Sequence, residues 1–284
     1  MTSTESYKRQ YKTLLECIQQ HTSAALAVSG GVDSLLLLHA AREALAHHVM
    51  AFTAVGPLYN PDETARAAEE AALLGVRHEE IYFDPFSVDD LDANGPNRCY
   101  VCKRRLFRYI LDAARREGFH VVMDGTNADD PGDYRPGIRA LEELEVVSPF
   151  LEAGLGKDDI RALSRMRNIE GADRPAMACY ASRFPYGERI TPEGLERVRR
   201  AEAALSDMGF VQYRVRSHGD LARVEIAPDE MDRAFRRDAV SAMSQRLKEA
   251  GFLYVSLDMD GYRTGSLNES LDDATARPDN SMKK

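Results

Sequence analysis

The stretch AVSGGVDSLLLLHA occupies residues 27–40 and decides the fold of this chain. A short apolar run ends at two glycines, and a leucine-rich segment begins directly after them. This pattern predicts a buried strand, a tight turn and a helix from about residue 33 to residue 46. The turn leaves backbone N–H groups at the positive end of a helix dipole, which favours phosphate binding. The loop has no lysine and so differs from the Walker loop G-x-x-x-x-G-K-[ST].

The composition is that of an ordinary globular protein. The chain has 284 residues, of which 44% are hydrophobic and 29% charged, so it can bury one large core or two modest ones. The first ten residues are polar, and no run of 18 apolar residues occurs. We therefore expect neither a signal peptide nor a membrane span, and we place the protein in the cytoplasm. The net charge of −9 weighs against extensive contact with nucleic acid.

Two patterns of predicted elements divide the chain. Strands alternate with helices as far as residues 120–125, which predicts an α/β domain with a parallel sheet over residues 1–175. A long loop rich in glycine, proline and small residues follows. Beyond it, the order helix, strand, strand, helix (232–250) and strand predicts a smaller α+β domain over residues 176–268. Residues 269–284 are polar, and we expect them to be disordered.

A second motif, DGTNADD at residues 124–130, follows a predicted strand. In a parallel sheet, the carboxyl ends of neighbouring strands meet at one edge, where ligands bind. We therefore expect Gly125, Thr126 and Asn127 to lie beside the first loop. Nearby Asp129, Asp130 and Asp133 suit Mg²⁺, which prefers carboxylate and phosphate oxygens. The alternative is that these acidic residues only cap the next turn.

The hexapeptide SGGVDS at residues 29–34 resembles the pyrophosphate loop of the ATP pyrophosphatases, the adenine nucleotide α-hydrolase superfamily. Members of that superfamily cleave ATP between the α- and β-phosphates. They adenylate an acyl or carbonyl oxygen, release pyrophosphate and let a nucleophile displace AMP. The resemblance implies that the loop holds the pyrophosphate part of ATP. The alternative is a capped helix start, because Asp33 and Ser34 also suit the first turn of a helix.

Further motifs narrow the resemblance to the LarE family. They are NRCYVCKRRLF (97–107), GTNADDPGDYRPGIRAL (125–141), VVSPF (146–150), PAMACYASRFPYGERIT (175–191), YRVRSHGDLARVEI (213–226) and LDMDGYRTGSLNE (257–269). This family completes sulfur insertion for the nickel-pincer cofactor of lactate racemase. The resemblance implies that the substrate is pyridinium-3,5-biscarboxylic acid mononucleotide, whose carboxylates become thiocarboxylates. It also implies a homo-oligomer, because known members are hexamers of trimer-forming subunits.

The cysteines are candidates for the sulfur chemistry. Cys179 lies near Arg183 and Arg189, whose positive charge favours a thiolate. In single-cysteine members of the family, the matching cysteine gives up its sulfur and becomes dehydroalanine. This chain also carries Cys99 and Cys102, and three thiolates can hold a [4Fe–4S] cluster with one iron open. A zinc site is a rival interpretation. An isolated Cys17 in the first helix is expected to be a small buried residue.

Arg214 and Arg216 alternate along a predicted strand and so face one side of it. The family pattern favours a clamp on the substrate phosphate, because a guanidinium binds phosphate through two hydrogen bonds. The alternative is a solvated strand face. We expect Asp33, Ser34 and Cys179 to be catalytic. The complete set expected to bind ATP and substrate is Ala27, Ser29, Gly30, Gly31, Val32, Asp33, Ser34, Gly125, Thr126, Asn127, Asp130, Arg135, Arg183, Arg214 and Arg216.

Three other functions are compatible with the sequence. A tRNA thiolase shares the loop and sometimes a cysteine-bound cluster, but the acidic balance disfavours it. An amide-forming enzyme of NAD or GMP synthesis shares the adenylation step, yet it has no role for three cysteines. A non-catalytic nucleotide-binding module is a further alternative. The expected cofactors of the leading hypothesis are ATP, Mg²⁺ and the [4Fe–4S] cluster.

Overall fold

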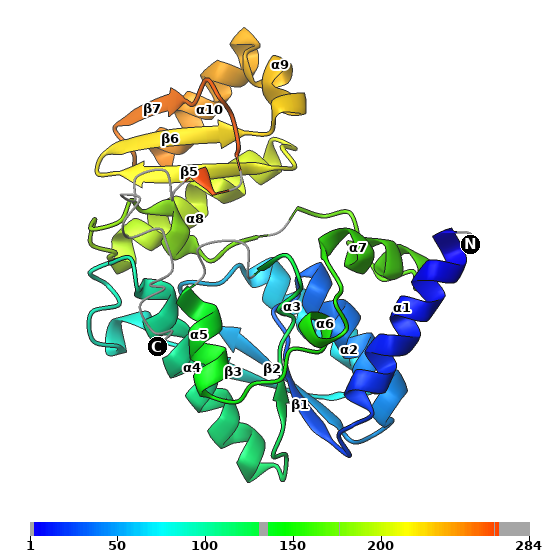
Figure 1. Cartoon of the computed structure of the whole chain (residues 1–284). Helices are drawn as coiled ribbons and strands as arrows, with labels where there is room; N and C mark the ends of the chain where they lie inside the picture. Colours follow the sequence, from blue (N-terminus) through cyan, green and yellow to red (C-terminus); the bar gives the residue numbers. More distant parts are fainter. Residues whose placement is uncertain (1–2, 131–135, 176, 264, 267–284) are drawn as a thin grey trace, which may run out of the picture. The chain divides into compact units, whose positions relative to one another are not determined.

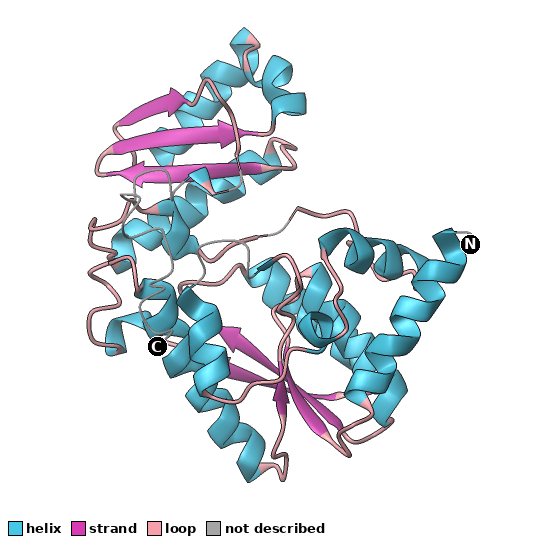
Figure 2. Cartoon of the chain, viewed as in Figure 1, coloured by secondary structure: helices cyan, strands magenta, loops and turns pink. Residues whose placement is uncertain are grey.

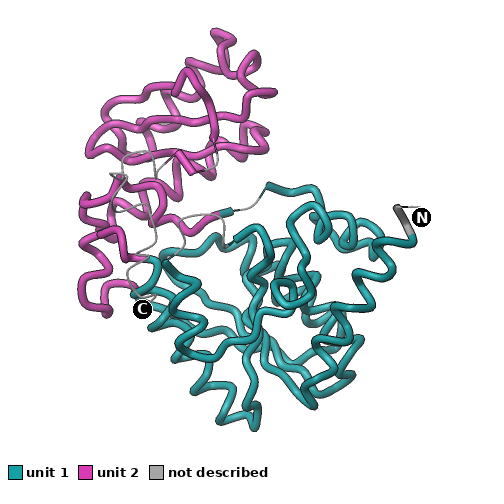
Figure 3. The backbone as a smooth tube through the Cα atoms, viewed as in Figure 1, with its two compact units in different colours: residues 1–84, 99–177 teal, residues 85–98, 178–284 magenta. Residues whose placement is uncertain are grey.

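The chain folds into two compact units (Figure 3). A computed structural model describes residues 3–130, 136–175, 177–263 and 265–266. The first unit comprises Met1–Asp84 and Cys99–Met177, and the second comprises Pro85–Arg98 and Ala178–Lys284. The segment Pro85–Arg98 therefore belongs to the second unit, although we had placed it in the first. The predicted disordered tail lies outside the described residues, as does Arg135.

The first unit is built on a parallel four-stranded sheet with helices on both sides (Figures 1 and 2). Its strand order is β3-β2-β1-β4, and every neighbouring pair is parallel. The strands are β1 (Ala24–Ala27), β2 (Val49–Val55), β3 (Arg77–Tyr82) and β4 (Val122–Met123). This arrangement confirms the predicted α/β fold class.

The helices of the first unit connect and cover these strands. They are α1 (Ser3–Ile18), α2 (Val32–Leu45), α3 (Pro61–Leu73), α4 (Arg98–Arg116), α5 (Pro136–Glu143), α6 (Pro149–Glu152) and α7 (Lys157–Met166). Helix α3 begins where it does because the side chain of Asn60 accepts a hydrogen bond of 2.8 Å from the Asp62 N–H. Pro61 follows at the first helical position, where a missing N–H costs nothing.

Helix α2 is buried on nearly all sides, which explains its run of four leucines. Leu35, Leu36, Leu37 and Leu38 each have 1% or less of their surface exposed. Four consecutive residues of a helix point in different directions, so such a run fits only a helix surrounded by protein. It packs against the sheet, α1 and α7. The first turn of α2 is therefore held in a fixed position at the end of β1.

The second unit has its own three-stranded sheet, in the order β5-β6-β7. The strands are β5 (Tyr213–His218), β6 (Leu221–Ile226) and β7 (Tyr254–Leu257); β5 and β6 are antiparallel, whereas β6 and β7 are parallel. Helices α8 (Pro192–Asp207) and α10 (Arg237–Glu249) pack against the sheet, and α9 (Met231–Ala234) precedes α10. The result is the expected α+β arrangement.

Two details differ from the sequence-based prediction. The single helix expected over residues 232–250 is interrupted between α9 and α10, because Arg236 has an extended backbone conformation (φ −63°, ψ 140°). The long loop before α8 contains a short 3₁₀ helix at Tyr180–Arg183, and two others lie at Pro85–Ser87 and Pro228–Glu230. None of the described helices is both long and apolar enough to cross a membrane.

Candidate active site

The loop between β1 and α2, residues 29–34, is held together by the hydroxyl group of Ser34. The N–H groups of Ser29 and Gly30 donate to Ser34 Oγ over 3.1 and 3.2 Å, and this hydroxyl donates to the Gly31 carbonyl over 2.9 Å. The Gly31 N–H donates to Ser29 Oγ over 3.3 Å. Three successive N–H groups thus converge on two adjacent hydroxyls. These hydrogen bonds fix the loop at the N-terminal end of α2, where the helix dipole favours an anion.

Gly30 is the position in this loop that tolerates no side chain. Its φ of +84° lies in the left-handed region, and a Cβ there would stand 1.9 Å from the carbonyl oxygen of Glu63 on α3. Gly31 differs, because its φ is −76° and the nearest atom to a built Cβ is Ser29 Oγ at 3.5 Å. The first glycine is therefore required by close packing against α3.

The second predicted motif lies against the first. A Cβ built on Gly125 would stand 3.3 Å from the Ser34 nitrogen, so the loop after β4 touches the first turn of α2. The Asn127 side-chain amide donates to Asp33 Oδ2 over 3.0 Å, across 94 positions of sequence. Thr126 donates to the Asp124 carboxylate over 2.6 Å, which shapes this second loop. The two motifs therefore form one continuous surface at the carboxyl edge of the sheet.

Asp33 stands in an environment that disfavours its charge. Burial raises the pKa of its carboxyl, and the nearby Asp130 raises it further, whereas the Asn127 hydrogen bond lowers it. Lys157 and Arg161 also lower this pKa by their positive charge. Both basic residues come from the start of α7. Neither residue was among those predicted from sequence, although a lysine directly after Gly156, where α7 begins, was an available signal.

The aspartates proposed for Mg²⁺ bind backbone groups of the same site. Asp129 Oδ2 accepts a 2.7 Å hydrogen bond from the Lys157 N–H, and Asp130 Oδ2 accepts one of 3.0 Å from the Asn127 N–H. Asp133 lies outside the described residues. Ala27 ends β1 and Val32 begins α2, so both flank the loop. The Mg²⁺ site stays a prediction.

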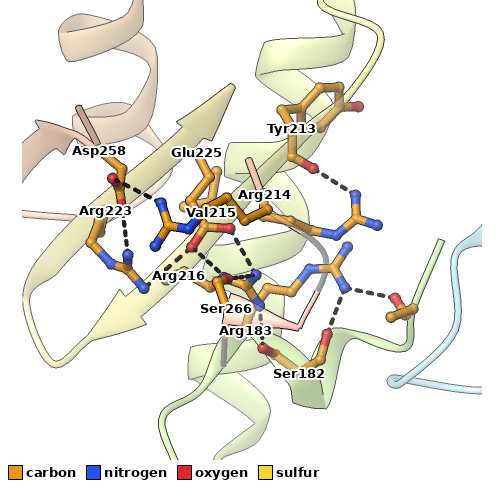
Figure 4. Close-up of polar contacts among 12 residues, drawn as sticks. Ser182, Arg183, Tyr213, Arg214, Val215, Arg216, Arg223, Glu225, Asp258 and Ser266 are labelled. Carbon is orange, nitrogen blue, oxygen red and sulfur yellow. Dashed lines mark hydrogen bonds and ion pairs between the residues drawn. The ribbon is translucent and has the colours of Figure 1, made fainter. Parts of the chain in front are cut away.

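The second unit contains a buried cluster of three arginines and two glutamates, of which Figure 4 labels the arginines and Glu225. We call this set the arginine cluster; its members are Arg183, Arg214, Arg216, Glu202 and Glu225. Arg183 has no exposed surface, and its guanidinium forms two hydrogen bonds of 2.8 Å with Glu202. It also donates to the carbonyl of Cys179 over 3.2 Å. Arg183 therefore holds the loop that carries Cys179.

Arg214 and Arg216 lie on one side of β5, as the alternation predicted, but they are only 3% and 5% exposed. This burial excludes the solvated strand face. Arg216 donates to Glu225 Oε2 and to the Ser182 carbonyl, both over 2.7 Å. Its Nε is buried and makes no hydrogen bond within the part of the chain that the structure describes.

Arg214 carries a positive charge that its surroundings oppose. Its guanidinium lies 5.1 Å from the ring centre of Tyr262 and donates to the Tyr213 carbonyl over 2.6 Å. Burial lowers the pKa of Arg214, and the charge of Arg183 lowers it further, whereas the charge of Glu202 raises it. Arg183, Arg214 and Arg216 thus gather three positive charges in one buried cluster, which favours an anion there.

The cysteines divide between the two units. Cys99 and Cys102 lie in the first turn of α4, and Cys179 directly precedes the 3₁₀ helix of the second unit. All three are partly exposed and none forms a disulfide. The described residues contain no group of three His, Cys, Asp or Glu side chains gathered as metal ligands. Arg189, expected to act on Cys179, forms an ion pair of 2.6 Å with Asp92.

Comparison with known proteins identifies the family. A family model described as asparagine synthase matches residues 12–132. An uncharacterized protein of Synechocystis sp. is 40% identical over 248 residues, which cover 87% of this chain and 92% of the relative. The pyridinium-3,5-bisthiocarboxylic acid mononucleotide synthase of Lactiplantibacillus plantarum is 33% identical over 261 residues, covering 91% of this chain and 94% of the relative. The chain belongs to the LarE family.

Membership of the LarE family confirms the resemblance drawn from the motifs. The protein is an ATP-dependent sulfurtransferase of the PP-loop ATP pyrophosphatase superfamily. It uses ATP. We call residues 29–34 the PP-loop, the role predicted for them from the SGGVDS motif. Sulfur transfer is thereby selected over amide formation and over a non-catalytic nucleotide-binding module.

Proposed function

We propose that this protein adenylates the carboxylates of pyridinium-3,5-biscarboxylic acid mononucleotide and converts them to thiocarboxylates for the nickel-pincer cofactor. The observation that carries this proposal is the match to the L. plantarum synthase along nearly the whole of both chains. Adenylation makes chemical sense because a carboxylate is a poor electrophile. Its oxygen attacks the α-phosphorus of ATP, pyrophosphate leaves, and AMP becomes a good leaving group for attack by sulfur.

The first unit supplies the groups for ATP cleavage. The PP-loop at the N-terminal end of α2 receives the pyrophosphate part of ATP, and Lys157 and Arg161 add positive charge beside Asp33. The carboxylates of Asp33 and Asp130 are the oxygen donors that suit Mg²⁺, which would neutralise phosphate charge there. Asp33→Ala or Ser34→Ala should therefore abolish pyrophosphate release without unfolding the protein.

The second unit supplies the groups for the mononucleotide. Arg214 and Arg216 lie on one side of β5 within the buried arginine cluster. The Nε–H of Arg216 is buried and can still donate a hydrogen bond to an anion. These features support the role predicted from the family pattern, in which both arginines bind the substrate phosphate.

We propose that Cys99, Cys102 and Cys179 hold a [4Fe–4S] cluster through which sulfur is delivered. The C-x-x-C spacing in α4 places two thiols on one helix face, which supports a pair of ligands. The alternative is that Cys179 gives up its own sulfur, in which case it becomes dehydroalanine; zinc is a further occupant of the same thiols.

One experiment tests both the reaction and the sulfur source. Protein purified anaerobically is incubated with ATP, the biscarboxylic mononucleotide and inorganic sulfide as the sulfur source, and small molecules and protein are analysed by mass spectrometry. The proposal expects thiocarboxylate product, AMP and pyrophosphate, about four irons per chain, and an intact Cys179 after several turnovers. A dehydroalanine at Cys179 would refute delivery through the cluster and show that Cys179 gives up its own sulfur.

Variants and an alternative acceptor complete the test. Cys99→Ala should lose the cluster and multiple turnover, whereas Cys17→Ala serves as the matched control. Burial and the neighbouring Glu152 raise the pKa of Cys17, which disfavours its thiolate. Thiolation of added tRNA, with no reaction of the mononucleotide, would overturn the proposed substrate. The hexamer implied by the family is checked by light scattering of the same preparation.

A further inference from the structure

Helix α3 touches the PP-loop through one backbone contact and one side chain. The contact is that of Gly30 with the Glu63 carbonyl, where a Cβ would come within 1.9 Å. The side chain is that of Arg66, almost one helical turn further on. Its Nη1 donates a hydrogen bond of 3.0 Å to the carbonyl oxygen of Gly30, 36 positions away in sequence. Arg66 appears in none of the motifs discussed so far.

The peptide between Gly30 and Gly31 is thereby held from both ends. Its carbonyl oxygen accepts from Arg66 and its N–H donates to Ser29 Oγ over 3.3 Å. A peptide with these two partners cannot rotate about its flanking bonds without losing one of them, and glycine on either side offers no steric resistance to such a rotation. A positively charged donor on the carbonyl also polarises the peptide, which strengthens the N–H as a donor.

The positive charge of Arg66 is disfavoured by some of its surroundings and favoured by others. Burial lowers the pKa of its guanidinium, and the positive charge of Arg174 lowers it further; Glu63 and Glu170 act in the opposite direction. Arg174 is itself bonded to Glu170 over 3.1 Å. A partly buried guanidinium with a like charge nearby suits a site whose ligand is a polyphosphate.

We propose that Arg66 is a positioning residue for ATP cleavage: by binding the Gly30 carbonyl, it fixes the Gly30–Gly31 peptide and so keeps the PP-loop in the conformation that receives the departing pyrophosphate. The proposal rests on ATP use by this enzyme class and does not depend on which acceptor the protein adenylates. It adds a residue from α3 to a loop that was defined by β1 and α2.

Arg42 provides a matched control for the test. It lies on α2, and its Nε donates a 3.0 Å hydrogen bond to the carbonyl of Leu74, which caps α3. Arg42 and Arg66 therefore each join α3 to its neighbour by a guanidinium–carbonyl bond, but Arg42 does so in the last turn of α2, away from the PP-loop. Methionine replaces either side chain with a similar apolar stem and no charge.

The experiment measures binding of ATP and of pyrophosphate by calorimetry, together with the melting temperature, for Arg66→Met, Arg42→Met and the unchanged protein. We expect Arg66→Met to weaken both ligands by about 10- to 100-fold, the value of one charge-assisted hydrogen bond. Arg42→Met should lower the melting temperature by as much as Arg66→Met does, but its affinity for ATP and pyrophosphate should be unchanged. Steady-state pyrophosphate release should show a raised KM for ATP in Arg66→Met, and Arg66→Lys should recover part of the loss.

Two results would overturn the proposal. One is an Arg66→Met protein that binds both ligands within twofold of the unchanged protein, and the other is an equal loss of affinity in Arg42→Met, which would show a general effect of loosening α3. If Arg66→Met does not fold, Arg66→Lys and Arg66→Gln carry the same comparison. Because ATP and pyrophosphate binding need no acceptor, an incorrect mononucleotide assignment would leave these measurements unaffected.

Discussion

The PP-loop of the first unit and the arginine cluster of the second unit are both suited to phosphate, but they are built from different groups. The PP-loop uses backbone N–H groups, two serine hydroxyls and the end of a helix. The arginine cluster uses buried guanidiniums that are ordered by buried carboxylates. The backbone site is defined by a short local stretch, whereas the side-chain site requires residues from several elements.

The two regions also differ in how their carboxylates are stabilised. Burial raises the pKa of Asp33, so its charged form is unfavourable in the folded protein. Burial alone would raise the pKa of Glu202 as well, but the charge and hydrogen bonds of Arg183 lower it. The positive charges and hydrogen bonds around Asp33 therefore do not offset the cost of its burial, whereas those around Glu202 do. Such a difference is typical of a ligand site compared with a structural ion pair.

The largest effect on stability is expected from Glu202→Gln. This change leaves the charge of Arg183, which has no exposed surface, without its partner. We expect the free energy of unfolding to fall by about 3–5 kcal/mol, measured by urea denaturation. The control is Glu196→Gln on the same helix, whose ion pair with Arg199 is nearly half exposed and should contribute less than about 1 kcal/mol. Equal effects of the two changes would refute the structural role of the buried pair.

The next effect concerns the two glycines of the PP-loop. Gly30→Ala forces a methyl group against the Glu63 carbonyl at a positive φ, so the loop must leave its position and ATP binding should be lost. Gly31→Ala introduces no comparable clash and should retain the loop conformation with a much smaller loss of affinity. Calorimetric titration with ATP separates the two variants, and similar affinities would contradict the close contact with α3.

A third effect separates the two phosphate sites. Arg214→Ala combined with Arg216→Ala should weaken mononucleotide binding far more than ATP binding, because each lost charge-assisted hydrogen bond is worth roughly 1.5–3 kcal/mol. Both ligands are titrated into the same preparation. A parallel loss for ATP and mononucleotide would indicate a general structural defect instead of a local one.

The smallest effect concerns the pH dependence of stability. Because the pKa of Asp33 is raised above its usual 3.8, the folded protein binds this proton more tightly than the unfolded chain does. Stability must then fall as the pH rises from the unfolded to the folded pKa, and the charged carboxylate destabilises the protein at neutral pH. Asp33→Asn should therefore raise the melting temperature slightly at pH 7, although pyrophosphate release is lost. The rise should vanish below about pH 4. A rise independent of pH would have another cause.

The strand, turn and helix around the PP-loop could be read from residues 27–40 because every part of that unit is local in sequence. An apolar run, two glycines and a leucine-rich helix leave few other conformations. The same holds for Asn60 and Pro61 at the start of α3 and for the alternation of Arg214 and Arg216. The parallel sheet also followed from the order of elements, since parallel strands need helical connections.

What the tertiary structure alone decided is which distant side chains meet. Arg183 was predicted from sequence to lie near Cys179 and to bind ATP or substrate; the fold adds its pairing with Glu202 and its hydrogen bond to the Cys179 carbonyl. No pattern in the sequence indicates that Lys157 lies near Asp33 or that Arg66 donates to the Gly30 carbonyl. A charged side chain on a helix looks alike whether it faces solvent or a loop, because its partner is set by packing and not by neighbouring residues. The phosphate loop was thus determined by sequence, and the charges around it were determined by the fold.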